Sequence, residues 1–264
     1  MKRIILLAAV LILICGCTKE TNLFIVGEVY RFAKQDILFE HTQVELFSDP
    51  IPNTITVKVN GEVLEPHEPI FGYDRDYGYC FYGNDSLIPG SEYILEVETD
   101  VGNANGLCRL PHDFDITSPG DSVASGEALN IAWPIVDVAD WYMVWVAFYR
   151  YDSTYIQLKD TLIYTDVASP VTIPDEWLDG YGYLSIEVYA GNGPSEKEHS
   201  GGNIQGAQGF WIGINCKSKQ VTVGTPAALP SRQQERTQKD IIKAYLKRLA
   251  LYNEEAAEVL EIVE

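Results

Sequence analysis

The residue types that commonly carry catalysis are few and scattered in this chain of 264 residues. The four histidines, His41, His67, His112 and His199, lie far apart in the sequence, and the spacings HExxH, GxSxG, GxGxxG and the Walker pattern do not occur. Zinc proteases, serine hydrolases and nucleotide-binding enzymes commonly carry one of these patterns. The inventory therefore predicts a protein that is not an enzyme.

Two acidic pairs are weak candidates for a metal site. Asp74 and Asp76 lie in one Tyr-rich and Gly-rich segment, and Asp113 and Asp115 lie at a proposed seam between two units. Calcium takes about six to eight hard oxygen ligands, which carboxylates converging at a seam could supply. Neither pair has EF-hand spacing, so solvated loop acids are the alternative, and no cofactor besides calcium is expected.

Aromatic residues form the most specific candidate binding surface. Strand alternation over residues 141–149 places Tyr142, Val144, Val146 and Phe148 toward a core and the intervening residues outward. The same reasoning for two later strands gives an outward face of six aromatics: Trp141, Trp145, Tyr149, Tyr183, Tyr189 and Trp211. An apolar face of this size needs a cover, either the chain's own tail or first unit, a partner protein, or stacked sugar rings. A register error of one residue would exchange the two faces.

These residues must be positioned by strands. Residues 22–224 alternate in short segments separated by Gly, Pro, Asn and Asp, which is typical of antiparallel β-sandwiches. Asn60-Gly61 lies between two such segments and predicts a type I′ hairpin turn. The Gly-rich loop over 191–206 is either a recognition loop or a tolerated insertion. We expect one sandwich domain over 22–112 and a second over 113–224.

Several segments resemble fibronectin type III or related immunoglobulin-like modules. The run from Leu87 to Val97 contains Leu-x-Pro-Gly-x-x-Tyr and resembles the corner and sixth strand of such a module. In the second unit, residues 129–133 resemble the second strand with its core Trp133, residues 141–149 the third, and residues 184–192 the sixth. Leu184 stands where these modules usually carry Tyr. The resemblance implies two tandem sandwiches and says nothing of function.

The N-terminus has the pattern of a targeting segment. Lys2 and Arg3 precede eleven unbroken apolar residues, a run too short to span a bilayer, and Ile14-Cys15-Gly16-Cys17 follows. This ending resembles a bacterial lipobox. The resemblance implies a lipoprotein signal peptide over 1–16, acylation of Cys17 with palmitate-like chains, and a tether over 17–21. The protein would then be anchored in the cell envelope, at the outer membrane in a Gram-negative cell.

Export would place the remaining cysteines in an oxidising compartment. Cys80 and Cys108 lie in one predicted domain and are the candidate disulfide, which leaves Cys216 as a small buried hydrophobe. Three free thiols in cores are the alternative.

Residues 225–264 form a predicted linker and a long C-terminal α-helix that begins at Ser231. Apolar spacings of four and three, with one polar position, predict a coiled-coil seam. The seam consists of Ile242, Leu246, Leu249, Asn253, Ala256, Leu260 and Val263. The first half of this tail is basic and its end acidic, so two antiparallel copies would match in charge and form a homodimer. Alternatively, the seam lies across the aromatic face of its own second domain.

The charge balance limits the partners. The chain has 19 Lys and Arg against 38 Asp and Glu, a formal net charge of −19, which excludes a nucleic-acid-binding role. The expected partners are the membrane, through the lipid, and an envelope protein or a glycan. The predicted fold is mainly β, with two tandem sandwiches and a C-terminal helix. The predicted function is non-catalytic structural or adhesive interaction; the alternative is a carbohydrate-binding accessory lipoprotein that uses the aromatic face.

Overall fold

The computed structural model describes residues 22–34, 37–49, 51–67, 79–83, 86–151, 156–195 and 202–224. Strands dominate this part of the chain. They form because apolar and polar residues alternate in short segments, which are separated by turn residues such as Gly, Pro, Asn and Asp. The strands are β1 (Asn22–Lys34), β2 (Ile37–Asp49), β3 (Ile55–Val59), β4 (Glu62–Val63), β5 (Glu65–His67), β6 (Tyr79–Gly83), β7 (Glu92–Thr99), β8 (Asn103–Arg109), β9 (Ser122–Val123), β10 (Leu129–Ile131), β11 (Trp141–Tyr151), β12 (Ile156–Thr165), β13 (Val171–Ile173), β14 (Gly182–Asn192), β15 (Ile204–Gln205) and β16 (Gln208–Val223).

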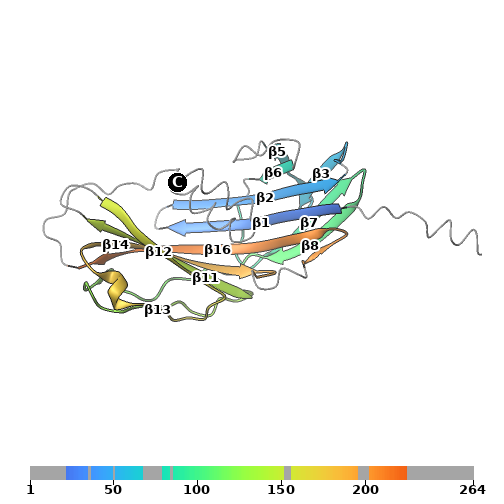
Figure 1. Ribbon diagram of the computed structural model, residues 1–264. Helices are drawn as coiled ribbons and strands as arrows, with labels where there is room; N and C mark the ends of the chain where they lie inside the picture. Colours follow the sequence, from blue (N-terminus) through green and yellow to red (C-terminus); the bar gives the residue numbers. More distant parts are fainter. Residues whose placement is uncertain are drawn as a thin grey trace, which may run out of the picture.

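One nine-stranded sheet combines strands from both halves of the described sequence. Its order is β12-β11-β14-β16-β1-β2-β6-β5, and β9 pairs with β16 beside this path. Figure 1 shows β16 following β1 at one end of the molecule and β14 at the other. The pairs β1–β16 and β9–β16 are parallel, whereas the other strand pairs in this sheet are antiparallel. The first and last described strands are therefore hydrogen-bonded neighbours at the centre of the sheet.

Two smaller sheets complete the sandwich. A five-stranded sheet in the order β15-β8-β7-β3-β4 and the pair β10-β13 each contribute to a separate core cluster. Along β16, Trp211 belongs to the first cluster, and Val221 and Val223 belong to the second. Because these three residues have the same parity in one strand, both cores lie on the same face of the nine-stranded sheet.

The opposite face of the large sheet carries a third cluster. Its buried members are Trp141, Met143, Trp145, Ala147, Tyr189, Ile212, Ile214 and Cys216, with Tyr30, Phe32, Tyr149 and Phe210 packed against them. We call this surface the aromatic face. All of these residues come from β1, β11, β14 and β16, which are neighbours in one sheet.

Two local predictions are confirmed. Asn60 and Gly61 connect β3 to β4 with φ values of 51° and 81°, the positive angles that a type I′ turn requires. At the predicted corner, the Tyr93 hydroxyl accepts a hydrogen bond from the backbone N–H of Ile88 at 2.7 Å. That bond joins the start of β7 to the preceding loop.

The predicted fold class, mainly β with tandem sandwiches and a long C-terminal α-helix, is wrong in its helical part, whereas a β-sandwich fits the described residues. The described residues are mainly strand and contain no α-helix; their one helical element is the short 3-10 turn η1 (Asp175–Leu178). Alternating apolar positions and turn residues run through the described part of the chain, which is why it is built from strands.

Several predicted features lie outside the described residues. They are the signal peptide, Cys17 and its tether, and the linker and heptad positions over 225–264. Within the part of the chain that the structure describes, no helix is long and apolar enough to cross a membrane.

Candidate binding surfaces

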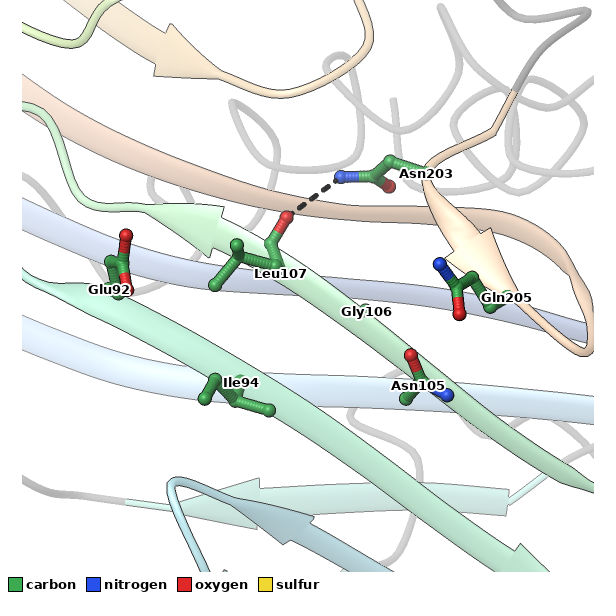
Figure 2. A pocket seen from close by; sticks show the side chains of 7 residues that line it. All are labelled: Glu92, Ile94, Asn105, Gly106, Leu107, Asn203 and Gln205. Atoms are coloured by element: carbon green, nitrogen blue, oxygen red, sulfur yellow. Dashed lines mark hydrogen bonds between the residues drawn. The ribbon is translucent and has the colours of Figure 1, made fainter.

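A groove of about 290 Å³ opens on the five-stranded sheet. Figure 2 shows its lining, which comes from β7, β8 and the segment around β15. The lining residues are Glu92, Ile94, Asn105, Gly106, Leu107, Asn203 and Gln205. Two aliphatic side chains thus lie among three amides and one carboxylate.

Strand alternation explains why this groove contains apolar groups. Along β7 and β8, buried and exposed residues alternate strictly, and the buried set packs into the first core. Ile94 and Leu107 fall on the outward set, where they are 47% and 50% exposed. Their outward neighbours on the same strands, such as Glu96 and Asn105, are polar. The alternation of side chains along each strand therefore places these two aliphatic residues on the solvent-facing side of the sheet.

The floor of the groove is rigid. A Cβ at Gly106 would lie 3.2 Å from the Cβ of Trp211, so β8 passes directly over this fully buried side chain. The indole Nε1 of Trp211 donates a hydrogen bond to the Tyr93 carbonyl oxygen at 2.9 Å. The amide of Asn203 pairs with the Trp211 backbone in both directions, at 2.7 and 2.8 Å. These contacts fix β15, β8 and β16 relative to one another.

The edge of β8 beside the groove is occupied. β15 pairs with Asn105 and Gly106 over only two residues. Beyond it, the Asn203 Nδ2 donates to the Leu107 carbonyl at 3.3 Å, as Figure 2 shows, and the Arg109 N–H donates to the Asn192 Oδ1 at 2.7 Å. An incoming strand would have to displace these contacts. The groove is therefore suited to recognition through side chains and not through strand addition.

Charge at the groove is modest. Arg109 donates to Glu92 from Nε at 3.0 Å and also from Nη2, and both side chains are about half exposed. An ion pair this exposed contributes little to stability. It places one positive and one negative charge at the rim of the groove. The seven lining residues thus supply one carboxylate, three amides and two aliphatic side chains, which is the chemistry of a binding surface.

The six aromatic residues predicted to share a face do not all do so. The structure places Trp141, Trp145, Tyr149, Tyr183 and Tyr189 on one face of the large sheet, as the register between β11 and β14 requires. Trp211 lies on the other face, within the first core. In β16 the inward and outward sets are reversed relative to the prediction, because Phe210, Ile212 and Ile214 pack on the aromatic face. Burial of Trp141 and Trp145, at 7% and 8% exposure, leaves little ring surface for stacking a sugar.

The candidate disulfide is not formed. Cys80, Cys108 and Cys216 are free and buried. The physical reason is their placement: Cys108 packs in the first core between the sheets, whereas Cys80 pairs with Glu45 on the opposite face of the large sheet. Burial raises the pKa of Cys80 to about 12 and raises the pKa of Cys108 further still. Both thiols are therefore protonated and unreactive near neutral pH.

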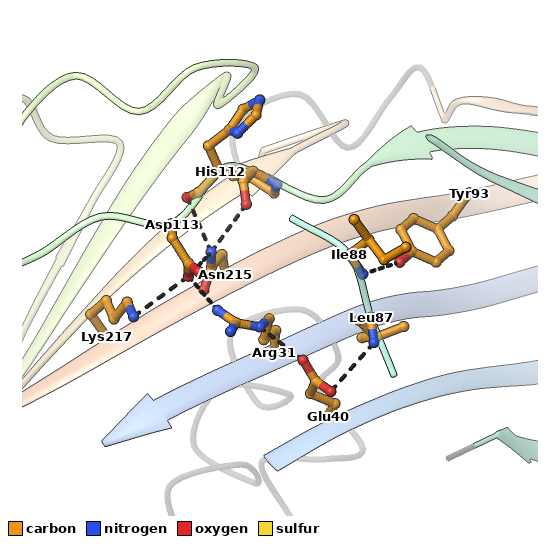
Figure 3. A network of polar contacts seen from close by, with 10 residues as sticks. Arg31, Glu40, Leu87, Ile88, Tyr93, His112, Asp113, Asn215 and Lys217 are labelled. Atoms are coloured by element: carbon orange, nitrogen blue, oxygen red, sulfur yellow. Dashed lines mark hydrogen bonds and ion pairs between the residues drawn. The ribbon is translucent and has the colours of Figure 1, made fainter. Parts of the chain in front are cut away.

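Of the acidic pair at the seam, Asp113 makes a structural contact. Arg31 donates to the Asp113 carboxylate, and Lys217 lies 3.5 Å from it. Asn215, which is fully buried, donates from Nδ2 to the carbonyls of Pro111 at 3.0 Å and His112 at 3.1 Å and to Asp113 at 3.2 Å. Figure 3 shows how these contacts join the connecting segment to β1 and β16.

The same network extends to the corner of the first unit. Arg31 Nε donates to Glu40 at 2.8 Å, and the second carboxylate oxygen of Glu40 accepts from the Leu87 N–H at 3.3 Å. Ile88 follows with its bond to Tyr93 (Figure 3). This network of hydrogen bonds and ion pairs therefore connects the two units at the seam.

These contacts do not favour a calcium site at the seam. Asp113 faces two cationic side chains, and Asp115 is a separate exposed residue. Asp74 and Asp76 lie outside the described residues. Among the residues that the structure describes, no group of three or more His, Cys, Asp and Glu side chains is placed to hold a metal ion.

Sequence reasoning found only part of the groove. The predicted recognition loop over 191–206 contains Asn203 and Gln205, which line it. Ile94 and Leu107 were missed. The sequence pattern could have indicated them, since each is an apolar residue among the outward-facing positions of its strand, which are otherwise polar.

Comparison with known proteins assigns no family. No protein-family model matches the chain, and no curated protein matches it either. Among solved structures, it is similar to the FN1–FN3 domains of chicken CNTN1, with 10% identity and a TM-score of 0.26, over 76% of this chain and 69% of that one. It is also similar to a tetra-tandem repeat in the extending region of a large adhesion protein, with 14% identity and a TM-score of 0.22, over 76% of this chain and 49% of that one. At TM-scores this low, neither neighbour carries a functional argument.

Proposed function

We propose that this protein is a lipid-anchored envelope protein that acts as a non-catalytic binding module and contacts its partner through the groove on β7, β8 and β15. The observation that carries the proposal is the exposure of Ile94 and Leu107 in a groove on rigid strands. Exposed apolar groups among convergent polar side chains are a common feature of recognition sites on soluble domains. The lipobox at Cys17 supports the envelope location.

The chemistry of the groove favours a protein partner over a glycan. Its apolar groups are aliphatic, and flat aromatic platforms, which suit sugar rings, are absent from the seven lining residues. Amide groups of Asn105, Asn203 and Gln205 can donate and accept hydrogen bonds at the rim. A partner that inserts one or two apolar side chains between them would match this arrangement.

Binding of envelope material to the immobilised protein tests the proposal. Envelope proteins and envelope oligosaccharides are applied separately, and we expect binding from the protein fraction. Leu107→Glu should weaken it by about tenfold or more, because a charge replaces an apolar contact at the centre of the site. Ile135→Glu is the matched control, since Ile135 is 96% exposed and outside the groove.

The results separate the alternatives. Equal loss of binding in both variants would contradict a role for the groove. Binding of oligosaccharides alone would contradict the protein-partner assignment and favour the carbohydrate-binding alternative.

A further inference from the structure

The aromatic face is a second surface that the proposed function does not use. It lies on the side of the large sheet away from both cores, and its members are contributed only by strands of that sheet. Among the described residues, no second layer of strands contributes to its cluster. Ile214 is nevertheless fully buried, and Met143 is 4% exposed. A surface of this composition requires a covering segment or partner.

Three carboxylates are embedded in this apolar surface. The register places Glu28 of β1 beside Ile212 and Glu187 of β14 beside Trp145. Glu45 of β2 lies beside Val26, which in turn pairs with Phe210 of the aromatic face. Glu28 and Glu187 are buried, at 9% and 1% exposure. Burial of a carboxylate is costly unless charged or hydrogen-bonding groups accompany it.

Each carboxylate contacts a polar group on the sheet. His41 Nε2 lies 3.2 Å from Glu28, the Tyr189 hydroxyl donates to Glu187 at 2.6 Å, and Gln43 donates to Glu45 at 2.8 Å. Burial raises the pKa of Glu45 despite its bond from Gln43, and the nearby charge of Glu28 raises it further. A covering group that carries positive charge would be favoured on this face over a neutral or acidic one.

We infer that this face is the docking surface for the C-terminal segment of the same chain, residues 225–264, with the basic part of that segment against the embedded carboxylates. Residues 231–248 contain six of the 19 Lys and Arg residues of the chain: Arg232, Arg236, Lys239, Lys243, Lys247 and Arg248. Only Glu235 and Asp240 oppose them there. The same stretch carries apolar residues such as Ile242 and Leu246, which suit the rest of the face.

The length of the segment is sufficient. The described residues end at Gly224, directly after β16, which pairs with β1 along its first part and with β14 along its second. Sixteen residues of strand extend about 53 Å at 3.3 Å per residue. Forty residues reach about 60 Å even at a rise of only 1.5 Å per residue. Return along the full face is therefore possible in any regular backbone conformation.

Met143 provides a clean measurement. The chain has two methionines, Met1 and Met143. Cleavage of the predicted signal peptide would remove Met1 and leave Met143 as the only methionine of the mature chain. Its oxidation by hydrogen peroxide, followed by the mass of the intact mature protein, reports whether the face is covered. We expect slow oxidation in the native protein compared with the urea-unfolded protein.

Charge variants in the segment test the docking without altering the sheet. Lys239→Glu, Lys243→Glu and Lys247→Glu, combined, should raise the oxidation rate about thirtyfold or more, because each reverses an attraction to buried carboxylates. The matched control keeps the charge, with Arg at the same three positions, and should oxidise like the native protein. Circular dichroism of each variant verifies that the strands remain.

Three results would overturn the inference. Native Met143 that oxidises as fast as in urea would mean that the segment leaves the face open for another molecule. An unchanged rate in the charge-reversed variant would remove the role of the basic residues. Protection that disappears on dilution would assign the cover to a second copy. None of these results affects the groove, which lies on the five-stranded sheet on the other side of the molecule.

Discussion

Replacing Trp211 with alanine is the most informative perturbation of the fold. Trp211 is fully buried, and it supports the groove from below through its contact with Gly106. Its Nε1 also satisfies the Tyr93 carbonyl at 2.9 Å. Truncation would therefore leave a cavity and remove a buried hydrogen-bond donor together.

The expected cost is large for one residue. Removal of a buried Trp side chain typically lowers the free energy of unfolding by about 3 to 5 kcal/mol, against a total of about 5 to 15 kcal/mol for a typical protein. In urea this corresponds to a midpoint lower by about 1 to 2 M. Ile135→Ala, at a site 96% exposed, should change the free energy by no more than about 0.5 kcal/mol.

A double-mutant cycle that combines Trp211→Ala with Gly27→Ala tests whether these two residues are in contact. A Cβ at Gly27 would lie 2.7 Å from Cε3 of Trp211, so Gly27→Ala should cost about 1 to 3 kcal/mol in the native background. After Trp211→Ala only the Gln43 carbonyl oxygen, at 3.1 Å, stays close to that Cβ, so the second substitution should cost much less than in the native background. The assay is urea unfolding followed by circular dichroism.

A cost of less than about 1 kcal/mol for Trp211→Ala, as expected for a surface residue, would contradict the structural role of this side chain. Additive effects of the two substitutions would also contradict it, since additivity would mean that Gly27 and Trp211 are not in contact.

Three further predictions follow from individual contacts. Tyr93→Phe removes the acceptor for the Ile88 N–H and should lower the free energy of unfolding by about 1 to 2 kcal/mol in urea titration; no change would contradict the corner bond. Burial and a pKa of about 12 should keep Cys80 unmodified by iodoacetamide at pH 8 until the protein unfolds, and rapid native labelling detected by mass would refute this. Although partial burial opposes it, the bond from Asn215 and the charges of Arg31 and Lys217 lower the pKa of Asp113 below its usual value. The resulting stability is present above about pH 4 and is lost as pH falls through the depressed pKa, so Asp113→Asn should flatten the acid limb of thermal melting curves; an unchanged limb would contradict it.

The proposed lipid anchor is tested separately in cells. Metabolic labelling with an alkyne fatty acid should mark the native chain, and Cys17→Ser should abolish both the label and the recovery of the protein in the membrane fraction. Label that persists in the variant would contradict acylation at this residue.

Short-range features of the fold could be predicted because local chemistry determines them. Asn60-Gly61 requires positive φ angles, and the corner motif ending at Tyr93 forms its bond within a few residues. The inward set Val144, Val146 and Phe148 was also predicted from alternation alone, and it packs in the second core.

Long-range features could not be predicted from alternation. The parallel pairing of β1 with β16 joins residues almost two hundred positions apart, and no local pattern encodes it. Alternation divides the residues of β16 between two faces of the sheet, but it does not determine which face lies in the core. Trp211 belongs to the core because β16 passes through the first unit beside Gly27, where the missing side chain makes room for the indole.

The disulfide and helix predictions both failed. Cys80 and Cys108 lie in one half of the sequence, but the large sheet separates their side chains. The helix prediction rested on a heptad spacing after Ser231, which lies outside the described residues, whereas the described fold is built from strands.

Site-specific photo-crosslinking at Leu107 in intact cells is the most direct test of the central claim, that the groove on β7, β8 and β15 is the binding site. A photoreactive residue is placed at position 107 and, in a second strain, at position 135. We predict a discrete protein adduct at position 107 that is absent at position 135 and is lost when Ile94→Glu is added. Absence of an adduct at position 107, or the same adduct at both positions, would contradict the assignment of the groove.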